Sequence, residues 1–225
     1  MNRCGVVRHA KLIPSRQLMA LRKHYENYHY SCSGTDFRPA YYISRMTERA
    51  RKTSTHVEVT PAAPEQEPIL ANLLELYGHD FSEFQDLDLG PDGRFGYKGL
   101  PLYWSEPDRH PFLVTVAGRL AGLVLVKRGS ERCGNESVWD MAEFFVVRGY
   151  RRRGIGTCIA HEVWRQFPGA WEIRVMQSNI SAYQFWARAI STFTGEVTPP
   201  VCVEKDGECW TLFSFESKRR VTTGE

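Results

Sequence analysis

The sequence of 225 residues has no run of about 20 apolar residues, the length that a helix needs to cross a bilayer. A membrane partner is therefore not expected. The N-terminal segment also lacks the unbroken apolar core of a secretory signal, because five basic residues interrupt it between Arg8 and Lys23. Acids are absent before Glu26, as in organelle transit peptides, but no amphipathic pattern extends over several turns.

Cysteine motifs are missing as well. The six cysteines form no Cys-x-x-Cys pair and show none of the Cys/His spacings of a zinc site. These residues are Cys4, Cys32, Cys133, Cys158, Cys202 and Cys209. The spacing argues against a disulfide scaffold and a structural metal, so we expect a cytoplasmic protein without a bound metal.

Acidic residues are scarce in the first quarter of the chain. Residues 1–55 contain 11 of the 29 Lys and Arg residues but only 3 of the 26 Asp and Glu residues. No sustained hydrophobic period runs through them, which favours a basic, poorly ordered N-terminal extension. Two other interpretations stay open: sequence upstream of a natural start at Met46, and a nucleic-acid-binding arm. Because no recognised nucleic-acid module accompanies the charges, nucleic acid is not an expected partner.

A regular hydrophobic pattern begins at His56 and predicts one domain over residues 56–217, followed by a tail over 218–225. Alternating apolar residues predict strands, and apolar residues three to four positions apart predict helices. The predicted elements are a strand at 57–59, a helix from Pro64 to Gly78, two strands within 111–129 joined at 117–119, a strand within 137–147, a helix over 155–167, a strand at 171–176, a helix over 180–190 and a hairpin over 200–215. The order is β-α-loop-β-β-β-α-β-α-β-β.

The predicted hairpin turns at Asp206-Gly207, which sets the register of its two strands. Glu204 then faces Cys209, and Cys202 faces Thr211. The two cysteines are diagonal neighbours at roughly 7 to 8 Å, beyond comfortable disulfide reach. We therefore expect reduced, half-buried thiols.

The stretch Arg151 to Thr157 places three arginines before Gly-Ile-Gly at the start of a predicted helix. Gly154 and Gly156 let a ligand approach the backbone closely, and the helix start offers unpaired N–H groups. Such a site binds phosphate oxygens, and the arginines add positive charge. The alternative is a solvated basic turn.

Two other phosphate-binding motifs are excluded because the residues that they require are missing. A Walker loop needs Gly-x-x-x-x-Gly-Lys-Ser/Thr, and no lysine follows the glycines here. A dinucleotide fingerprint needs a third Gly or Ala at position 159, which is Ile159.

The segment EFFVVRGYRRRGIGT, residues 143–157, resembles the acetyl-CoA motif of the GCN5-related N-acetyltransferase (GNAT) superfamily. Arg151, Gly154 and Gly156 fill its Arg/Gln-x-x-Gly-x-Gly/Ala positions. The element order over residues 57–215 and the stretch NISAYQFW also resemble that family. The resemblance implies an α/β (α+β) fold with a central mixed, mostly antiparallel sheet of six to seven strands flanked by helices, and an acetyl-CoA-dependent N-acetyltransferase.

The resemblance also implies the cofactor site. In that family the loop N–H groups hold the pyrophosphate of acetyl-CoA, and the end of the preceding strand holds the pantetheine arm. The implied cofactor-binding residues are Phe145, Val146, Val147, Arg151, Arg152, Arg153, Gly154, Ile155, Gly156, Thr157 and Asn179.

Glu143 is the candidate general base. In a regular strand it shares a face with Met141 and Phe145, whose apolar character raises a carboxylate pKa. It also occupies the acidic position that precedes the loop in many members of the resembled family. Asp140 is the reserve candidate, and a cross-strand hydrogen bond is the alternative role for Glu143.

The candidate general acid is Tyr183, provided that it faces the cleft. The family often has a tyrosine one helical turn later, where this chain has Trp186, which cannot protonate a thiolate at neutral pH. We expect Trp186 to shape the pocket. His110, His161 and Cys158 have no evident catalytic partner in the sequence, so we expect direct transfer in a ternary complex.

The expected acceptor is a primary amine on a small molecule or peptide. Five acids and no Lys or Arg lie between residues 79 and 92, in a connection that commonly borders the acceptor site of the resembled family. A cationic acceptor is therefore favoured, with a solvated acidic loop as the alternative. A homodimer and a CoA-binding module without catalysis stay open.

Overall fold

The computed structural model describes residues 56–130, 134–197, 199–205 and 207–218. The predictions for residues 1–55 and for the tail after Lys218 lie outside the described residues. None of the helices in the described part of the chain is long and apolar enough to cross a membrane.

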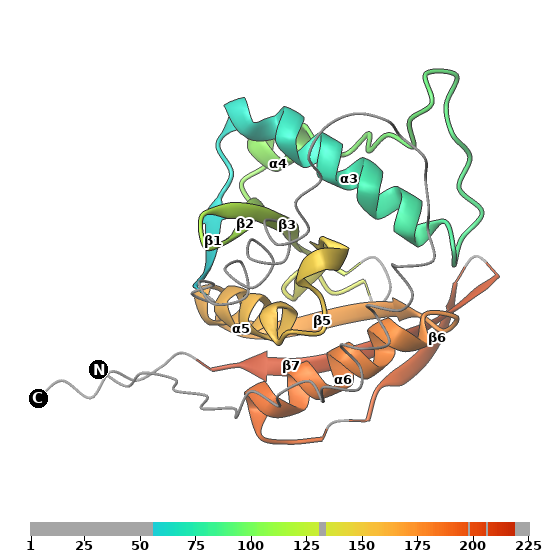
Figure 1. Ribbon diagram of the computed structural model, residues 1–225. Coiled ribbons are helices and arrows are strands. Elements are labelled where there is room, and N and C mark those ends of the chain that lie inside the picture. Colours follow the sequence, from blue (N-terminus) through green and yellow to red (C-terminus); the bar gives the residue numbers. More distant parts are fainter. Residues whose placement is uncertain (1–55, 131–133, 198, 206, 219–225) are drawn as a thin grey trace, which may run out of the picture. The chain divides into compact units, whose positions relative to one another are not determined.

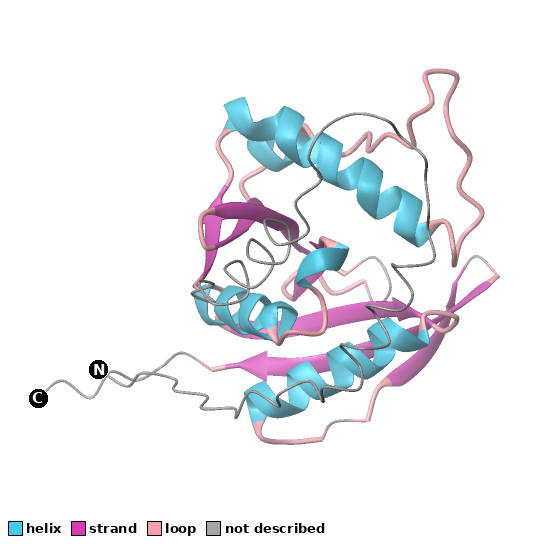
Figure 2. Cartoon of the chain, in the orientation of Figure 1, coloured by secondary structure: helices cyan, strands magenta, loops and turns pink. Residues whose placement is uncertain are grey.

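A seven-stranded mixed sheet forms the centre of the described domain, with strand order β1-β2-β3-β4-β5-β7-β6 (Figures 1 and 2). The strands are β1 (Val57–Pro61), β2 (Arg109–Val116), β3 (Arg119–Arg128), β4 (Trp139–Val146), β5 (Gly169–Met176), β6 (Val201–Lys205) and β7 (Glu208–Ser217). Strands β4 and β5 pair in parallel, and the other neighbours are antiparallel. The predicted fold class and element order are confirmed.

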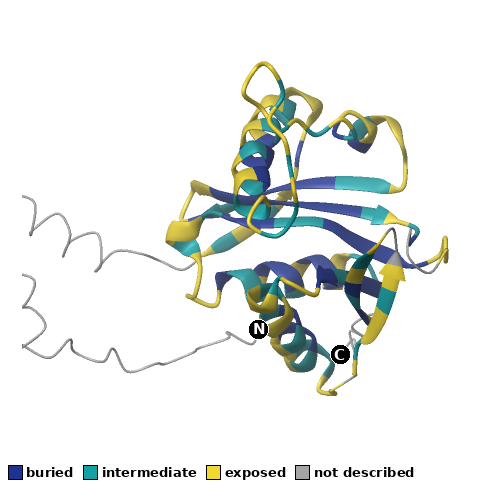
Figure 3. Ribbon diagram, turned by 90° about the vertical axis from the view of Figure 1, so that its right-hand side faces the viewer, coloured by how far each residue is buried: buried dark blue, intermediate teal, exposed yellow. Residues whose placement is uncertain are grey.

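Helices cover both faces of the sheet (Figure 1). One face carries α3 (Glu67–Phe81) and α4 (Leu102–Ser105), and the other carries α5 (Ile155–Gln166) and α6 (Ile180–Thr194). Two short 3-10 helices, η1 (Pro64–Gln66) and η2 (Arg148–Tyr150), precede α3 and α5. Each face has its own apolar core, and Figure 3 shows the buried residues in the sheet and on the helix sides that face it.

Helix α3 continues one turn past Gly78, which sequence analysis takes as its end. Gly78 is buried in the helix, and a Cβ atom added there meets the Phe95 ring at 3.0 Å. The glycine therefore permits close packing of the following loop and does not end the helix. Because Phe95 lies 17 positions further along the chain, no local pattern could show this contact.

A β-bulge in β4 changes which residues share a face. The register with β3 shifts between Leu125 opposite Glu143 and Val126 opposite Met141. Met141 consequently lies in the core beneath α5 and α6, whereas Ala142 and Phe145 lie in the core beneath α3. The prediction that Glu143 shares a face with both Met141 and Phe145 is wrong, because a bulge breaks the alternation on which it relied.

The predicted register of the last hairpin is confirmed. Cys202 pairs with Thr211 and Glu204 pairs with Cys209 across β6 and β7. Both thiols are free, as predicted, but they are exposed and not half-buried. The edge position of β6 leaves this part of the hairpin open to solvent.

Candidate active site

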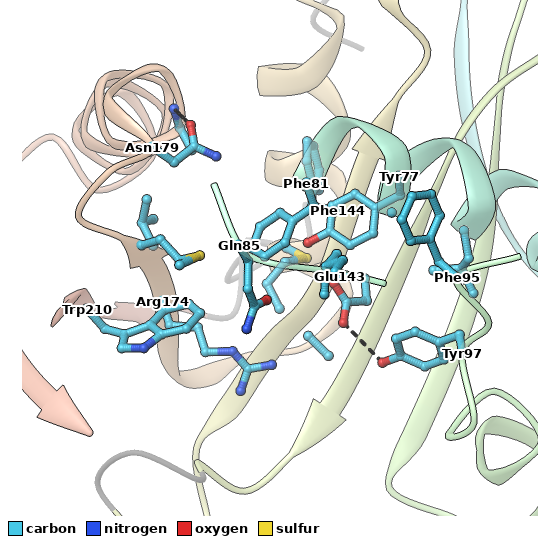
Figure 4. Close-up of a pocket in the computed structure, with 18 of the residues that line it drawn as sticks. Tyr77, Phe81, Gln85, Phe95, Tyr97, Glu143, Phe144, Arg174, Asn179 and Trp210 are labelled. Carbon is cyan, nitrogen blue, oxygen red and sulfur yellow. Dashed lines mark hydrogen bonds between the residues drawn. The ribbon is translucent and has the colours of Figure 1, made fainter. Parts of the chain in front are cut away.

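A cavity of about 650 Å³ opens where β4 and β5 cease to pair. Within the described residues the two strands pair only at Trp139 with Trp171 and at Asp140 with Glu172. The walls come from α3, the connection between α3 and α4, both diverging strands, the start of α6 and β7 (Figure 4). The cavity therefore collects residues from segments that are far apart in the chain, from Leu74 to Trp210.

Glu143 lines this cavity and contacts two tyrosines. The Tyr97 hydroxyl donates a hydrogen bond to Glu143 Oε1 at 3.1 Å, and the Tyr77 hydroxyl lies within hydrogen-bonding reach of the same carboxylate (Figure 4). Burial raises the pKa of Glu143 above its ordinary value, although the hydrogen bond from Tyr77, the positive charge of Arg174 and the hydrogen bond from Tyr97 oppose the rise. A buried carboxylate with a raised pKa is suited to accept a proton near neutral pH.

Both tyrosines stay protonated around this carboxylate. Burial, followed by the negative charge of Glu143, raises the pKa of Tyr77 and of Tyr97. Neither tyrosine is among the site residues predicted from the sequence. Tyr77 could be found only as part of an apolar helix face, and Tyr97 lies in a connection without periodicity.

Glu75 fixes the segment that carries Tyr97. Its carboxylate accepts hydrogen bonds from the N–H groups of Phe95 at 2.8 Å and Gly96 at 3.0 Å. The connection is therefore anchored to α3 immediately before Tyr97. This anchoring lets a loop residue reach a strand residue at a defined position.

Asp140, the reserve base, is engaged in an ion pair. Its Oδ2 atom lies 3.0 Å from Nη1 of Arg174 on β5, and the Asp140 residue is 1% exposed. Asp140 is also not among the residues that line the cavity. The geometry thus favours Glu143 over Asp140 as the group that faces a ligand in the cavity.

The stretch 151–157, here called the glycine loop, leads from η2 into α5. Gly154 caps α5 with φ of 79°, a left-handed conformation that favours glycine. The N–H of Cys158 bonds the Gly154 carbonyl, so the N–H groups of Ile155, Gly156 and Thr157 precede the first bond of the helix ladder. A Cβ atom added at Gly154 meets nothing within 4 Å. This helix N-terminus is open and suited to bind an anion.

Gly156 has a different role from Gly154. A Cβ atom added at Gly156 meets the Phe185 ring at 3.0 Å and lies 3.8 Å from Phe144. The stacked rings of Phe144 and Phe185 have centroids 5.6 Å apart. Gly156 therefore lets α5 approach an aromatic stack between β4 and α6.

The three arginines of the glycine loop are all exposed but differ in their contacts. No contact of the Arg152 or Arg153 side chain is recorded in the described structure, and Arg152 adopts a positive φ of 59°. Arg151 instead donates from Nε to the Val146 carbonyl at 2.6 Å and forms an ion pair with Asp80. Of the three side chains predicted to face phosphate, Arg151 is therefore held by Val146 and Asp80, whereas Arg152 and Arg153 make no such contact in the described structure.

The structure brings Asn179 but not Tyr183 to the cavity. Asn179 lines it as the N-cap of α6, and its side chain accepts a hydrogen bond from the Ala182 N–H at 2.9 Å. Tyr183 is 40% exposed, packs on Phe213 and is not among the cavity residues. Tyr183 thus does not line the cavity in this structure, and its role as the acid stays a prediction. Trp186, in contrast, is buried and lines the cavity, as expected.

The acids of the 79–92 connection do not gather at one site. Asp80 pairs with arginines outside the cavity, whereas Asp88 lines the cavity. Glu208 of β7 also lines it and accepts a 3.4 Å hydrogen bond from Gln85. The cavity therefore carries three carboxyl groups, from Asp88, Glu143 and Glu208, beside the guanidinium of Arg174. Of the three acids, only Asp88 and Glu143 were singled out in the sequence.

The remaining titratable candidates lie elsewhere. His161 sits between α5 and α6, where its Nε2 atom is 2.8 Å from the Ala189 carbonyl. His110 packs against Trp139 and Phe167, and Cys158 is exposed on α5. Within the described ranges, no group of three His, Cys, Asp or Glu side chains is arranged to hold a metal ion.

A family of known proteins matches the part of the chain that contains the glycine loop and the strands β4 and β5. Residues 70–190 match the model of the acetyltransferase (GNAT) family. The chain belongs to this family. A search of curated proteins found no significant match to this chain.

Solved structures have the same GNAT fold. An acetyltransferase from Thermus thermophilus is 17% identical, with 73% of this chain and 99% of that chain covered and a TM-score of 0.52. A GNAT family protein from Desulfovibrio desulfuricans is 11% identical, with 72% and 99% covered and a TM-score of 0.51. At these identities the likeness establishes the fold alone.

Proposed function

We propose that this GNAT protein transfers an acetyl group from acetyl-CoA to a primary amine by direct attack in a ternary complex. The observation that carries the proposal is the position of Glu143. This half-buried carboxylate lines the cavity on the strand that runs directly into the glycine loop. One continuous segment, from Glu143 to Thr157, thus carries both the proposed base and the proposed anion site.

The residues present fit the acetyl-CoA half of the site. The pyrophosphate would be held by the N–H groups of Ile155, Gly156 and Thr157, with Arg152 and Arg153 close by. The open space beside Gly154 leaves the approach to these groups clear. The pantetheine arm would follow Phe145 to Val147, where pairing with β5 has ended, and would pass Asn179.

Acetyl-CoA, when bound, supplies an activated thioester. Glu143 would take a proton from the acceptor so that the nitrogen lone pair can attack, directly or through water. Tyr77 and Tyr97 orient the carboxylate and stay neutral because their pKa values are raised. Protonation of the leaving thiolate by Tyr183 stays a prediction, and water is the alternative donor.

The acceptor is proposed to be cationic, on a small molecule or a peptide. Asp88 and Glu208 line the cavity together with Glu143, and Trp210 adds an aromatic surface. Carboxylates and aromatic faces both attract ammonium groups. Location in the cytoplasm and a homodimer stay predictions.

A second candidate function is CoA binding without catalysis. It is favoured by the absence of a tyrosine at Trp186 and by the placement of Tyr183 outside the cavity residues. A binding module of this kind would saturate with CoA and release no thiol with any amine.

The deciding experiment uses the full chain and follows amine-dependent release of free thiol from acetyl-CoA. The panel contains polyamines, aminoglycosides, amino acids and peptides, with their N-acetylated forms as matched controls. Thiol release with the free amines, but not with their N-acetylated forms, supports transfer. CoA binding without release across the panel favours the binding module, and absence of CoA binding contradicts the proposed site.

The acid limb of the pH profile offers a test of the base. Activity should fall as the pH drops through the raised pKa of Glu143, because the protonated carboxyl cannot accept a proton. Tyr97→Phe removes a hydrogen bond that stabilises the carboxylate, so the pKa of Glu143 rises further and the acid limb of kcat/KM shifts to higher pH. Tyr183→Phe is the control for the position of the limb: whatever it does to the rate, the acid limb should stay in place, because Tyr183 does not contact Glu143. An unshifted limb in Tyr97→Phe would contradict the assignment.

A further inference from the structure

Asp80 joins α3 to the segment that enters the glycine loop. Its carboxylate accepts hydrogen bonds from Arg148 in η2 and from Arg151 at the start of the loop. These contacts span 68 and 71 positions of the chain. The pairing is a tertiary link and not a local turn.

The link to Arg151 reaches the end of β4. Arg151 donates from Nε to the Val146 carbonyl at 2.6 Å, while its Nη2 contacts the Asp80 carboxylate. The guanidinium carbon lies 5.5 Å from the centre of the Phe145 ring. One side chain is therefore held by a carboxylate, a backbone carbonyl and an aromatic face at the same time.

Arg148 has only one of these three contacts, the one to Asp80. It bonds Asp80, but the described structure records no contact from its guanidinium to β4, and 69% of its side chain is exposed. Only 20% of the Asp80 side chain is exposed, compared with 39% for Arg151. The Asp80–Arg151 contact is the better shielded of the two, and it is the one that leads to the strand.

The carboxylate remains charged over a wide pH range. Burial raises the pKa of Asp80. Hydrogen bonds from Arg148 and Arg151, together with the charges of both guanidiniums, lower it by more, so the pKa lies below its ordinary value. The ion pair therefore persists at neutral pH. It is lost only as the pH falls below the ordinary pKa of an aspartate and through the lowered value.

We propose that Asp80 is a positioning residue for the cofactor site: it holds Arg151 against the Val146 carbonyl and so fixes the end of β4 and the entry to the glycine loop. The inference rests on the proposed function. It assigns the Arg151 side chain to ordering the loop backbone, and it leaves phosphate binding to the N–H groups and to Arg152 and Arg153. A loosened loop would present those N–H groups less well, so CoA binds more weakly.

The test compares Asp80→Asn with Arg148→Ala in the full chain by titration with CoA. Asp80→Asn should raise the Kd for CoA about fivefold to tenfold, because a charge-assisted contact to Arg151 is lost. The acceptor KM should stay unchanged. Arg148→Ala should bind CoA as the wild type does. Equal or tighter CoA binding in Asp80→Asn overturns the proposal, since a released Arg151 would then be reaching the phosphates.

A double variant and an exchange measurement complete the test. Asp80→Asn should cost no further affinity in an Arg151→Gln background, whereas independent losses overturn the proposed chain of contacts. Amide hydrogen exchange of residues 147–157 in the free protein should be faster in Asp80→Asn and unchanged in Arg148→Ala. This second readout needs no CoA. Wild-type protein that fails to bind CoA therefore contradicts the proposed function, whereas unaltered exchange in Asp80→Asn contradicts the role of Asp80.

Discussion

Glu143→Gln is expected to lower kcat by about 10²- to 10⁴-fold, the range for loss of a general base. The amide keeps the size of the carboxylate and can still accept hydrogen bonds from Tyr77 and Tyr97, but it cannot take a proton at neutral pH. CoA affinity should stay close to that of the wild type, because the glycine loop is unchanged. Steady-state kinetics and CoA titration separate the two quantities.

The same substitution should raise the melting temperature at neutral pH. The pKa of Glu143 is raised in the folded state, so the folded protein binds this proton more tightly than the unfolded chain does. The protonated group costs no stability below the ordinary pKa of a glutamate, and the penalty grows as the pH rises through the raised value. The neutral amide of the variant avoids the penalty, so the gain should vanish in acid.

Glu162→Gln is the matched control for both measurements. Glu162 lies on α5 with 53% of its side chain exposed and pairs only loosely, at 3.7 Å, with Arg165. It should leave kcat and the melting temperature nearly unchanged. Normal turnover in Glu143→Gln would remove Glu143 from the base assignment.

Gly156→Ala is expected to lower CoA affinity about tenfold or more and to reduce the free energy of unfolding by about 1 to 3 kcal/mol. The new methyl group meets the Phe185 ring at 3.0 Å and lies 3.8 Å from the Phe144 ring, which stacks on Phe185. The Phe185 ring, α5 or both must shift, and a shift of α5 displaces the N–H groups of the loop. Chemical denaturation and CoA titration measure the two losses.

A second change at Phe185 distinguishes a packing role from a ligand role. Phe185→Leu should recover most of the loss in the Gly156→Ala protein, because it removes the ring that the methyl group meets. Gly154→Ala is the contrasting variant: its Cβ has free space, but the left-handed φ costs about 1 to 2 kcal/mol, and Phe185→Leu should not recover it. Failure of Phe185→Leu to rescue Gly156→Ala would show that this glycine acts on the ligand.

Features that depend on neighbours in sequence could be predicted without the structure. The element order and the face of α5 formed by Ile155, Ile159 and Val163 follow from hydrophobic period. The pairing of Cys202 with Thr211 agrees with the two-residue turn that the sequence predicts at positions 206–207. The glycine loop at a helix start follows from the same local chemistry.

Features that depend on distant contacts could not be predicted. The bulge in β4 moves Met141 to the opposite core from Phe145, and periodicity has no signal for an inserted residue. Gly78 reads as a helix end, although its lack of a side chain accommodates Phe95. Exposure of the two hairpin cysteines depends on what covers an edge strand.

The candidate site shows the same division between local and distant information. The family motif, the expectation of an anion site at the helix start and Glu143 as the candidate base can be read from the sequence alone, because these are properties of one continuous segment. Only the tertiary structure brought Tyr77 and Tyr97 to that carboxylate and turned Arg151 toward Asp80. Side chains tens of residues apart meet through packing and charge pairing across the sheet, and no spacing along the chain encodes which of them will meet.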